Sequence, residues 1–249
     1  MIAILTKLIK EHPEWLHARE SKLSFMKTST PASGTKVDQG KVLIFVFEEE
    51  EKWPTLCVKT TRTYAAGESI RENHHNLQKL QEEVKGSVHS SLFALPLYLY
   101  DDGKIVFCIE SVCPGVRFSA STQDVELVME NYIAWQSHLA QNTKEFQTLP
   151  DNIRLPVITQ HGDMTPDNVL VSEKDIYLID YDYAGVSTLA GFDLFNFLSK
   201  IKLSSETLRL NCGKYFPRYF ESIGAEVGSY EALLPLYHQE EVKRKDVRL

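Results

Sequence analysis

Three polar residues near the middle of the chain, set at short fixed intervals around an apolar run, constrain the fold most. Asp163 follows His161-Gly162, Asn168 comes five residues after Asp163, and Asp180 comes twelve residues after Asn168. The apolar run Ile176–Ile179 has the length of a short buried strand, and Asp180 closes it. The pattern therefore predicts a polar loop that leads into short strands, with one carboxylate at the end of a strand.

The residue types in this pattern suit the transfer of a phosphoryl group. That reaction needs a carboxylate to orient the attacking hydroxyl and take its proton, and oxygen ligands to hold Mg²⁺ on the phosphates. Asp163 is the candidate for the first task. Taken alone, an Asp after Gly162 would more often cap a turn, and it is the register with Asn168 and Asp180 that favours the catalytic role. Asn168 and Asp180 are the candidate metal ligands. Asp182 would share one face of an extended segment with Asp180, where it either holds a second ion or is a surface acid.

Three separated segments, HGDMTPDNVL, LIDYDYAG and GFDLFNFL, resemble in order and spacing the aminoglycoside phosphotransferase and choline kinase family. The Asp-to-Asn interval is also that of the protein-kinase loop H-R-D-L-x-x-x-N, with Gly162 in place of Arg. The resemblance covers about residues 105–200 and is thinner over about 25–100. It implies an α+β, two-lobed protein-kinase-like fold, with a small N-terminal antiparallel β lobe carrying one helix and a larger, mainly helical C-terminal lobe. It also implies ATP and Mg²⁺, with direct in-line transfer of the γ-phosphoryl group to a hydroxyl.

Hydrophobic spacing predicts the order of the elements. Apolar residues recur at helical intervals over residues 2–20 and again over residues 65–84. Four runs predict the strands of two hairpins: Val42–Phe47, Thr55–Lys59, Leu92–Tyr100 and Lys104–Glu110. Helices dominate after residue 113. We therefore expect a nucleotide-binding lobe over residues 1–112 and a catalytic and acceptor-binding lobe over residues 113–249, with the nucleotide in the cleft between them.

Lys59 ends an apolar strand and resembles the strand lysine of kinases that contacts the α- and β-phosphates. Glu72, on the helix that follows, is the predicted ion-pair partner of Lys59, and Glu68, one turn earlier, is the competing candidate. The loop Ser33-Gly34-Thr35 is the candidate phosphate cover, although an ordinary hairpin turn would have the same composition. The segment Glu110–Gly115 lies where a hinge would offer backbone hydrogen bonds to adenine.

Composition and charge limit the classes of partner and the compartment that we expect for this protein. The formal net charge of −7 disfavours nonspecific nucleic-acid binding, which needs clustered Lys and Arg. No apolar stretch is long enough to span a membrane, and the N-terminal apolar run is too short for a secretory signal. The four cysteines have no paired C-x-x-C spacing. Reduced thiols in a cytoplasmic protein are the expected state.

These observations favour a small-molecule kinase whose partners are ATP and a hydroxylated acceptor of the aminoglycoside, amino alcohol or sugar type. A pseudokinase, which keeps the fold and binds nucleotide with little turnover, is the alternative, because the loop at Gly34 has few glycines. A metal-dependent hydrolase is a third possibility, but the sequence lacks a His or carboxylate pair at a spacing that would complete a two-metal site. The sequence does not select the acceptor.

Overall fold

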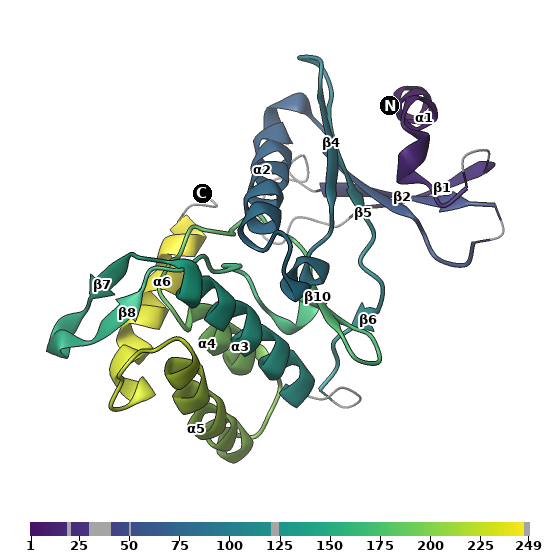
Figure 1. Cartoon of the computed structure of the whole chain (residues 1–249). Coiled ribbons are helices and arrows are strands. Elements are labelled where there is room, and N and C mark those ends of the chain that lie inside the picture. The colour runs from purple at the N-terminus through teal and green to yellow at the C-terminus, as the bar shows by residue number, and fades with distance from the viewer. Residues whose placement is uncertain (19–20, 30–40, 50, 121–124, 247–249) are drawn as a thin grey trace. The chain divides into compact units, whose positions relative to one another are not determined.

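The computed structural model of the chain describes residues 1–18, 21–29, 41–49, 51–120 and 125–246 (Figure 1). The candidate loop Ser33-Gly34-Thr35 lies outside the described residues. The chain forms two compact units: residues 1–78 with 94–113, and residues 79–93 with 114–249.

The first unit is built on a five-stranded antiparallel sheet in the order β1-β2-β3-β5-β4. Its strands are β1 (Leu23–Ser29), β2 (Lys41–Glu48), β3 (Leu56–Thr61), β4 (Pro96–Asp101) and β5 (Val106–Ser111). Both predicted hairpins are confirmed by the pairing of β2 with β3 and of β4 with β5. The edge strand β1 was not predicted, because its sequence lacks a regular alternation of apolar and polar side chains.

Helix α1 (Ile2–Glu11) packs its apolar stripe on this sheet, where Leu5 and Ile9 join Ile44 and Phe107 in one core cluster. The predicted helix over residues 2–20 is thus too long. The residue before a proline is disfavoured in the α region, so the helix ends before Pro13 and a 3-10 turn, η1 (Pro13–Trp15), follows.

Helix α2 (Glu68–Glu83) runs from the first unit into the second. Residues 79–93 pack with the second unit, whereas the sequence suggested a boundary near residue 112 alone. Gln81 donates to the carbonyls of Ser90 and Phe93, and the Phe93 ring packs edge-on against Trp135. The expected strand Leu92–Tyr100 therefore begins later, at Pro96.

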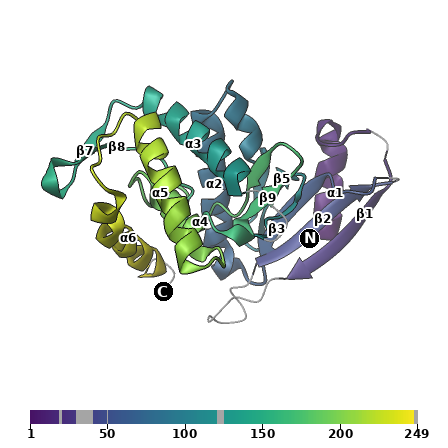
Figure 2. The same cartoon turned by 90° about the horizontal axis from the view of Figure 1, so that it is seen from below.

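The second unit is mainly helical. Its helices are α3 (Val125–Asn142), α4 (Phe192–Lys200), α5 (Ser205–Ser222) and α6 (Leu234–Asp246). Its short strands are β6 (Val116–Arg117), β7 (Phe146–Thr148), β8 (Arg154–Pro156), β9 (Val169–Val171) and β10 (Ile176–Leu178). Its 3-10 turns include η4 (Val88–Leu92), η5 (Pro150–Asn152), η6 (Pro166–Asn168) and η7 (Tyr230–Leu233). The first unit has a further 3-10 turn, η3 (Tyr64–Gly67), just before α2. Helix α5 packs against α3 and α4, and α6 packs against α4 (Figure 2). The predicted α+β class is confirmed.

Candidate active site

The loop that carries Asp163 is anchored through its backbone to a buried carboxylate. Asp193, in the first turn of α4, is fully buried and accepts hydrogen bonds from the backbone N–H of His161 at 2.5 Å and of Gly162 at 2.9 Å. Burial raises the pKa of Asp193 to about 7, while the N–H groups of His161, Gly162 and Met164 oppose that rise and the neighbouring Asp163 adds to it. The carboxylate fixes the backbone immediately before Asp163.

Gly162 is required by two features of this loop. Its φ of +79° lies in the left-handed region, which residues with a Cβ rarely adopt. A Cβ built on Gly162 would also lie 2.2 Å from the carbonyl oxygen of Tyr183, a backbone atom that cannot turn aside. The glycine therefore lets the loop pass directly against the segment that follows Asp180.

The structure brings Asp163 and Asn168 together as the spacing suggested. Asn168 Nδ2 donates to the carbonyl oxygen of Asp163 at 2.9 Å and to Asp163 Oδ2 at 3.0 Å. The carbonyl oxygen of Asn168 accepts from the N–H of Ile179 at 3.0 Å, so the loop is tied to the residue just before Asp180. With its amide hydrogens directed to Asp163, Asn168 has Oδ1 to offer a cation.

Asp180 has an unusual backbone. Strand β10 ends at Leu178, and Asp180 then takes a φ of 68°, an uncommon value for a residue with a side chain. Such strain is concentrated at functional sites. Asp182 opens the turn at residues 182–186. The alternation that would have placed Asp180 and Asp182 on one face applies only to an extended strand, so that part of the sequence reasoning is wrong.

The donor set of this loop fits a Mg²⁺ ion. Asn168 and Asp180 are both partly exposed, and they supply one amide oxygen and one carboxylate. Mg²⁺ takes few protein ligands of this hard-oxygen type and completes its shell with water and phosphate.

In the first unit, Lys59 is buried between two partners. Its ammonium lies 2.7 Å from Glu110 Oε1 on β5, and it donates to Asn73 Oδ1 on α2 at 3.3 Å. Glu68, the weaker sequence candidate, instead pairs with Arg71 at the surface. Glu72 is exposed and stands one position before Asn73, so its coupling to Lys59 stays a prediction.

Sequence reasoning missed Glu110 and Asp193 as residues that position others. Glu110 was considered only as the start of a hinge. Asp193 occurs in the segment GFDLFNFL, and a carboxylate inside so apolar a helix was a usable signal, because an isolated buried acid needs hydrogen-bond donors. No comparable local signal existed for Glu110, since its contact with Lys59 depends on strand register.

A sequence model of choline/ethanolamine kinases matches residues 39–212, more than half of the chain and including every residue of the loop and both candidate metal ligands. The chain belongs to the choline/ethanolamine kinase family. Membership of this family supports a small-molecule phosphotransferase in general and leaves the acceptor undefined. Among curated proteins, none matches the chain at a significant level of sequence similarity.

Solved structures agree on the fold. The chain is similar to the aminoglycoside phosphotransferase APH(3'')-Id from Streptomyces rimosus, with a TM-score of 0.59, 10% identity, and coverage of 96% of this chain and 97% of that one. An aminoglycoside-3'-phosphotransferase of type VIII gives a TM-score of 0.57 at 15% identity over 90% and 94% of the two chains. Amicoumacin kinase hAmiN, solved with AMP-PNP, Ca²⁺ and Ami, gives 0.57 at 11% identity over 95% and 83%. The expected kinase-like α+β fold is thereby confirmed. Within the described residues, no helix combines the length and apolar character needed to cross a membrane.

Proposed function

We propose that the protein transfers the γ-phosphoryl group of ATP directly to a hydroxyl of a small molecule, with Asp163 as the residue that receives the acceptor. The observation that carries this proposal is the pair Asp163–Asn168, joined by two hydrogen bonds on a loop that Asp193 anchors. A structural turn would not need an amide and a carboxylate fixed to each other next to a strained Asp180.

Asp163 acts chiefly by position. Phosphoryl transfer passes through a loose transition state, so a carboxylate of ordinary basicity suffices when it orients the hydroxyl and accepts its proton late. Asn168 donates to Oδ2 of Asp163, and in this proposal the carboxylate of Asp163 receives the acceptor hydroxyl. The hydrogen bonds from the backbone of His161 and Gly162 to Asp193 hold the chain in place immediately before Asp163.

Lys59 contacts the phosphates of ATP in this proposal, with Glu110 and Asn73 holding its ammonium in place. Asn168 and Asp180 hold Mg²⁺, which when bound neutralises charge on the phosphates. The sequence candidates Ser33, Gly34 and Thr35 remain proposed phosphate contacts, and Asp182 remains a proposed supporting acid. Burial raises the pKa of the Cys57 and Cys108 thiols, so they stay protonated and react slowly with oxidants. Unreactive buried thiols are compatible with the cytoplasmic location that we propose.

Two measurements on the purified chain test this function. Titration calorimetry with Mg·ATP should show binding, and ADP release should increase when a suitable hydroxylated acceptor is added. Binding of Mg·ATP without acceptor-dependent ADP release across sugars, amino alcohols and aminoglycosides would support the pseudokinase instead. Absence of Mg·ATP binding would contradict both.

A further inference from the structure

The chain immediately before the Asp163 loop is held by a fully buried glutamine, Gln160. Its backbone N–H donates to the segment 185–187 at 3.3 Å, and its carbonyl accepts from the same segment at 2.9 Å. Its side-chain Oε1 accepts from the hydroxyl of Tyr132 on α3 at 3.0 Å and from the backbone N–H of Asp193 at 3.4 Å. Because the carboxylate of Asp193 anchors the next two N–H groups of the loop, Gln160 holds both the loop and its anchor.

A second fully buried amide, Gln136 on α3, extends this network to another helix. Gln160 Nε2 donates to Gln136 Oε1 at 2.5 Å, and that oxygen also accepts from the hydroxyl of Tyr219 on α5 at 3.2 Å. Gln136 Nε2 donates to the carbonyl of Thr159 at 3.0 Å. The orientation of both amides is fixed, because the carbonyl of Thr159 can only accept and the backbone N–H of Asp193 can only donate. Every nitrogen and oxygen of the two amides therefore has a partner.

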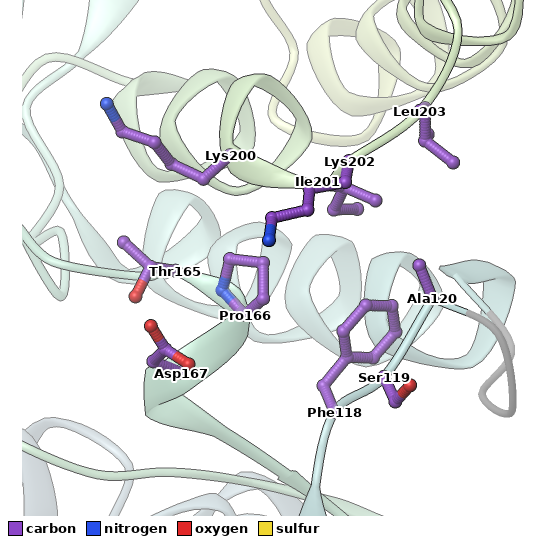
Figure 3. A pocket seen from close by; sticks show the side chains of 10 residues that line it. All are labelled: Phe118, Ser119, Ala120, Thr165, Pro166, Asp167, Lys200, Ile201, Lys202 and Leu203. Atoms are coloured by element: carbon purple, nitrogen blue, oxygen red, sulfur yellow. The ribbon is translucent and has the colours of Figure 1, made fainter.

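The part of the loop that follows Asp163 is more open. Figure 3 shows the side chains of Thr165, Pro166 and Asp167 together on one side of a pocket of about 810 Å³, and none of the three is buried. The backbone of Asp163 is therefore held mainly from the side of Gln160.

A buried network of this kind specifies one arrangement of the chain. An apolar core of the same shape would bury as much surface and would tolerate small shifts of the loop. Buried amides and hydroxyls lose their partners when the chain shifts, and a buried polar group without a partner is costly. Helices α3 and α5 thereby determine where the chain lies at residue 160, three residues before Asp163.

We propose that Gln160, supported by Gln136 and Tyr132, is a positioning residue for phosphoryl transfer, which holds Asp163 where the acceptor hydroxyl arrives and touches no substrate itself. This inference rests on the proposed phosphotransferase function and deepens it. A misplacement of about 1 Å at a reacting group can cost about a hundredfold in rate, so loss of the network acts on turnover. Binding of Mg·ATP, which in the proposed function involves Lys59 and the metal ligands, is expected to change little.

Two substitutions remove the network to different extents. Gln160→Met keeps the size of the side chain and removes its hydrogen bonds, whereas Tyr132→Phe removes one hydroxyl. With an acceptor that wild-type protein phosphorylates, kcat should fall about tenfold in Gln160→Met and about threefold in Tyr132→Phe, with the KM for Mg·ATP nearly unchanged. Ser137→Ala is the matched control, because Ser137 donates to the carbonyl of Ser222 at 2.8 Å and so joins the same two helices one residue along from Gln136. Its kcat should equal that of wild type.

The same substitutions in an Asp163→Asn background separate positioning from a general structural effect. An amide at residue 163 cannot take the acceptor proton, so its exact placement matters less, and Gln160→Met and Tyr132→Phe should lower turnover much less there than in wild type. An equal fold-loss in both backgrounds, an unchanged kcat, or the same loss in Ser137→Ala overturns the inference while the kinase proposal stands. Should Gln160→Met fail to fold, Tyr132→Phe decides by the same comparison. If wild-type protein does not bind Mg·ATP or releases no ADP with any acceptor, the proposed function fails and this inference fails with it.

Discussion

The ion pair between Lys59 and Glu110 offers a quantitative test of how the first unit is held together. The two charged atoms lie 2.7 Å apart, and the side chains are 8% and 6% exposed. Glu110 Oε2 is buried without a hydrogen-bond partner among the described residues, so the pair with Lys59 is the main compensation for burying this carboxylate. Replacing either residue by Met leaves one charge buried without its oppositely charged partner.

Each single substitution, Lys59→Met or Glu110→Met, should lower the free energy of unfolding by about 3–5 kcal/mol. The double variant has no buried charge left, so it should lose far less than the sum of the singles, with a coupling energy of about 3 kcal/mol or more. Urea denaturation followed by fluorescence and by circular dichroism measures this, and coincident transitions confirm that the two probes report one event.

Lys214 and Glu126 provide the matched control. Their charged atoms are also 2.7 Å apart, but the side chains are 44% and 50% exposed, so water screens the pair. The same cycle of Met substitutions there should give only a small coupling. A coupling between Lys59 and Glu110 no larger than that of the surface pair would refute the reasoning, and coupling of Lys59 to Glu72 instead would restore the sequence-based assignment.

Three further predictions concern the second unit. Burial raises the pKa of Asp193 from its ordinary 3.8 to about 7, so between these pH values the folded protein keeps a proton that the unfolded chain has lost. As pH rises from about 4 to 7, the free energy of unfolding of wild-type protein should therefore fall, relative to that of Asp193→Asn, by up to about 4 kcal/mol in urea titrations. Parallel pH profiles of the two proteins would contradict this. Gly162→Ala should lower turnover at least about tenfold and lower the Tm, because its Cβ meets the Tyr183 carbonyl; an active, equally stable variant would show that the loop can shift. Asp180→Ala should weaken Mg·ATP binding more than Asp182→Ala does, and calorimetry showing the reverse order would mean that their roles are exchanged.

The sequence could indicate that Asp163 and Asn168 lie together, because that contact is local. Asp163 and Asn168 are five residues apart in a tight loop, so the spacing nearly determines their contact. The partner of Lys59 was not predictable in this way. Lys59 pairs in register with Cys108, which places Glu110 diagonally across from it on the same face of neighbouring strands. That neighbour follows from the register of two strands about fifty residues apart, which no local pattern reveals.

Helix length shows a second kind of limit. The apolar spacing from Ile2 onward was a correct signal for α1, but Pro13 was the stronger signal for its end. The expectation of an extended segment through Asp182 failed for a related reason, because strand alternation was continued past the end of β10 into a turn. Both differences arise where a periodic pattern was continued beyond the residue that stops it.

Asp163→Asn tests the central claim most directly. The amide keeps the size of the carboxylate and can still contact Asn168, but it cannot take the acceptor proton and orients the hydroxyl poorly. With an acceptor that wild-type protein phosphorylates, turnover of the variant should fall at least about a hundredfold while calorimetry shows Mg·ATP binding nearly unchanged. A variant that retains most of its turnover would remove Asp163 from the mechanism and contradict the proposed role of the loop.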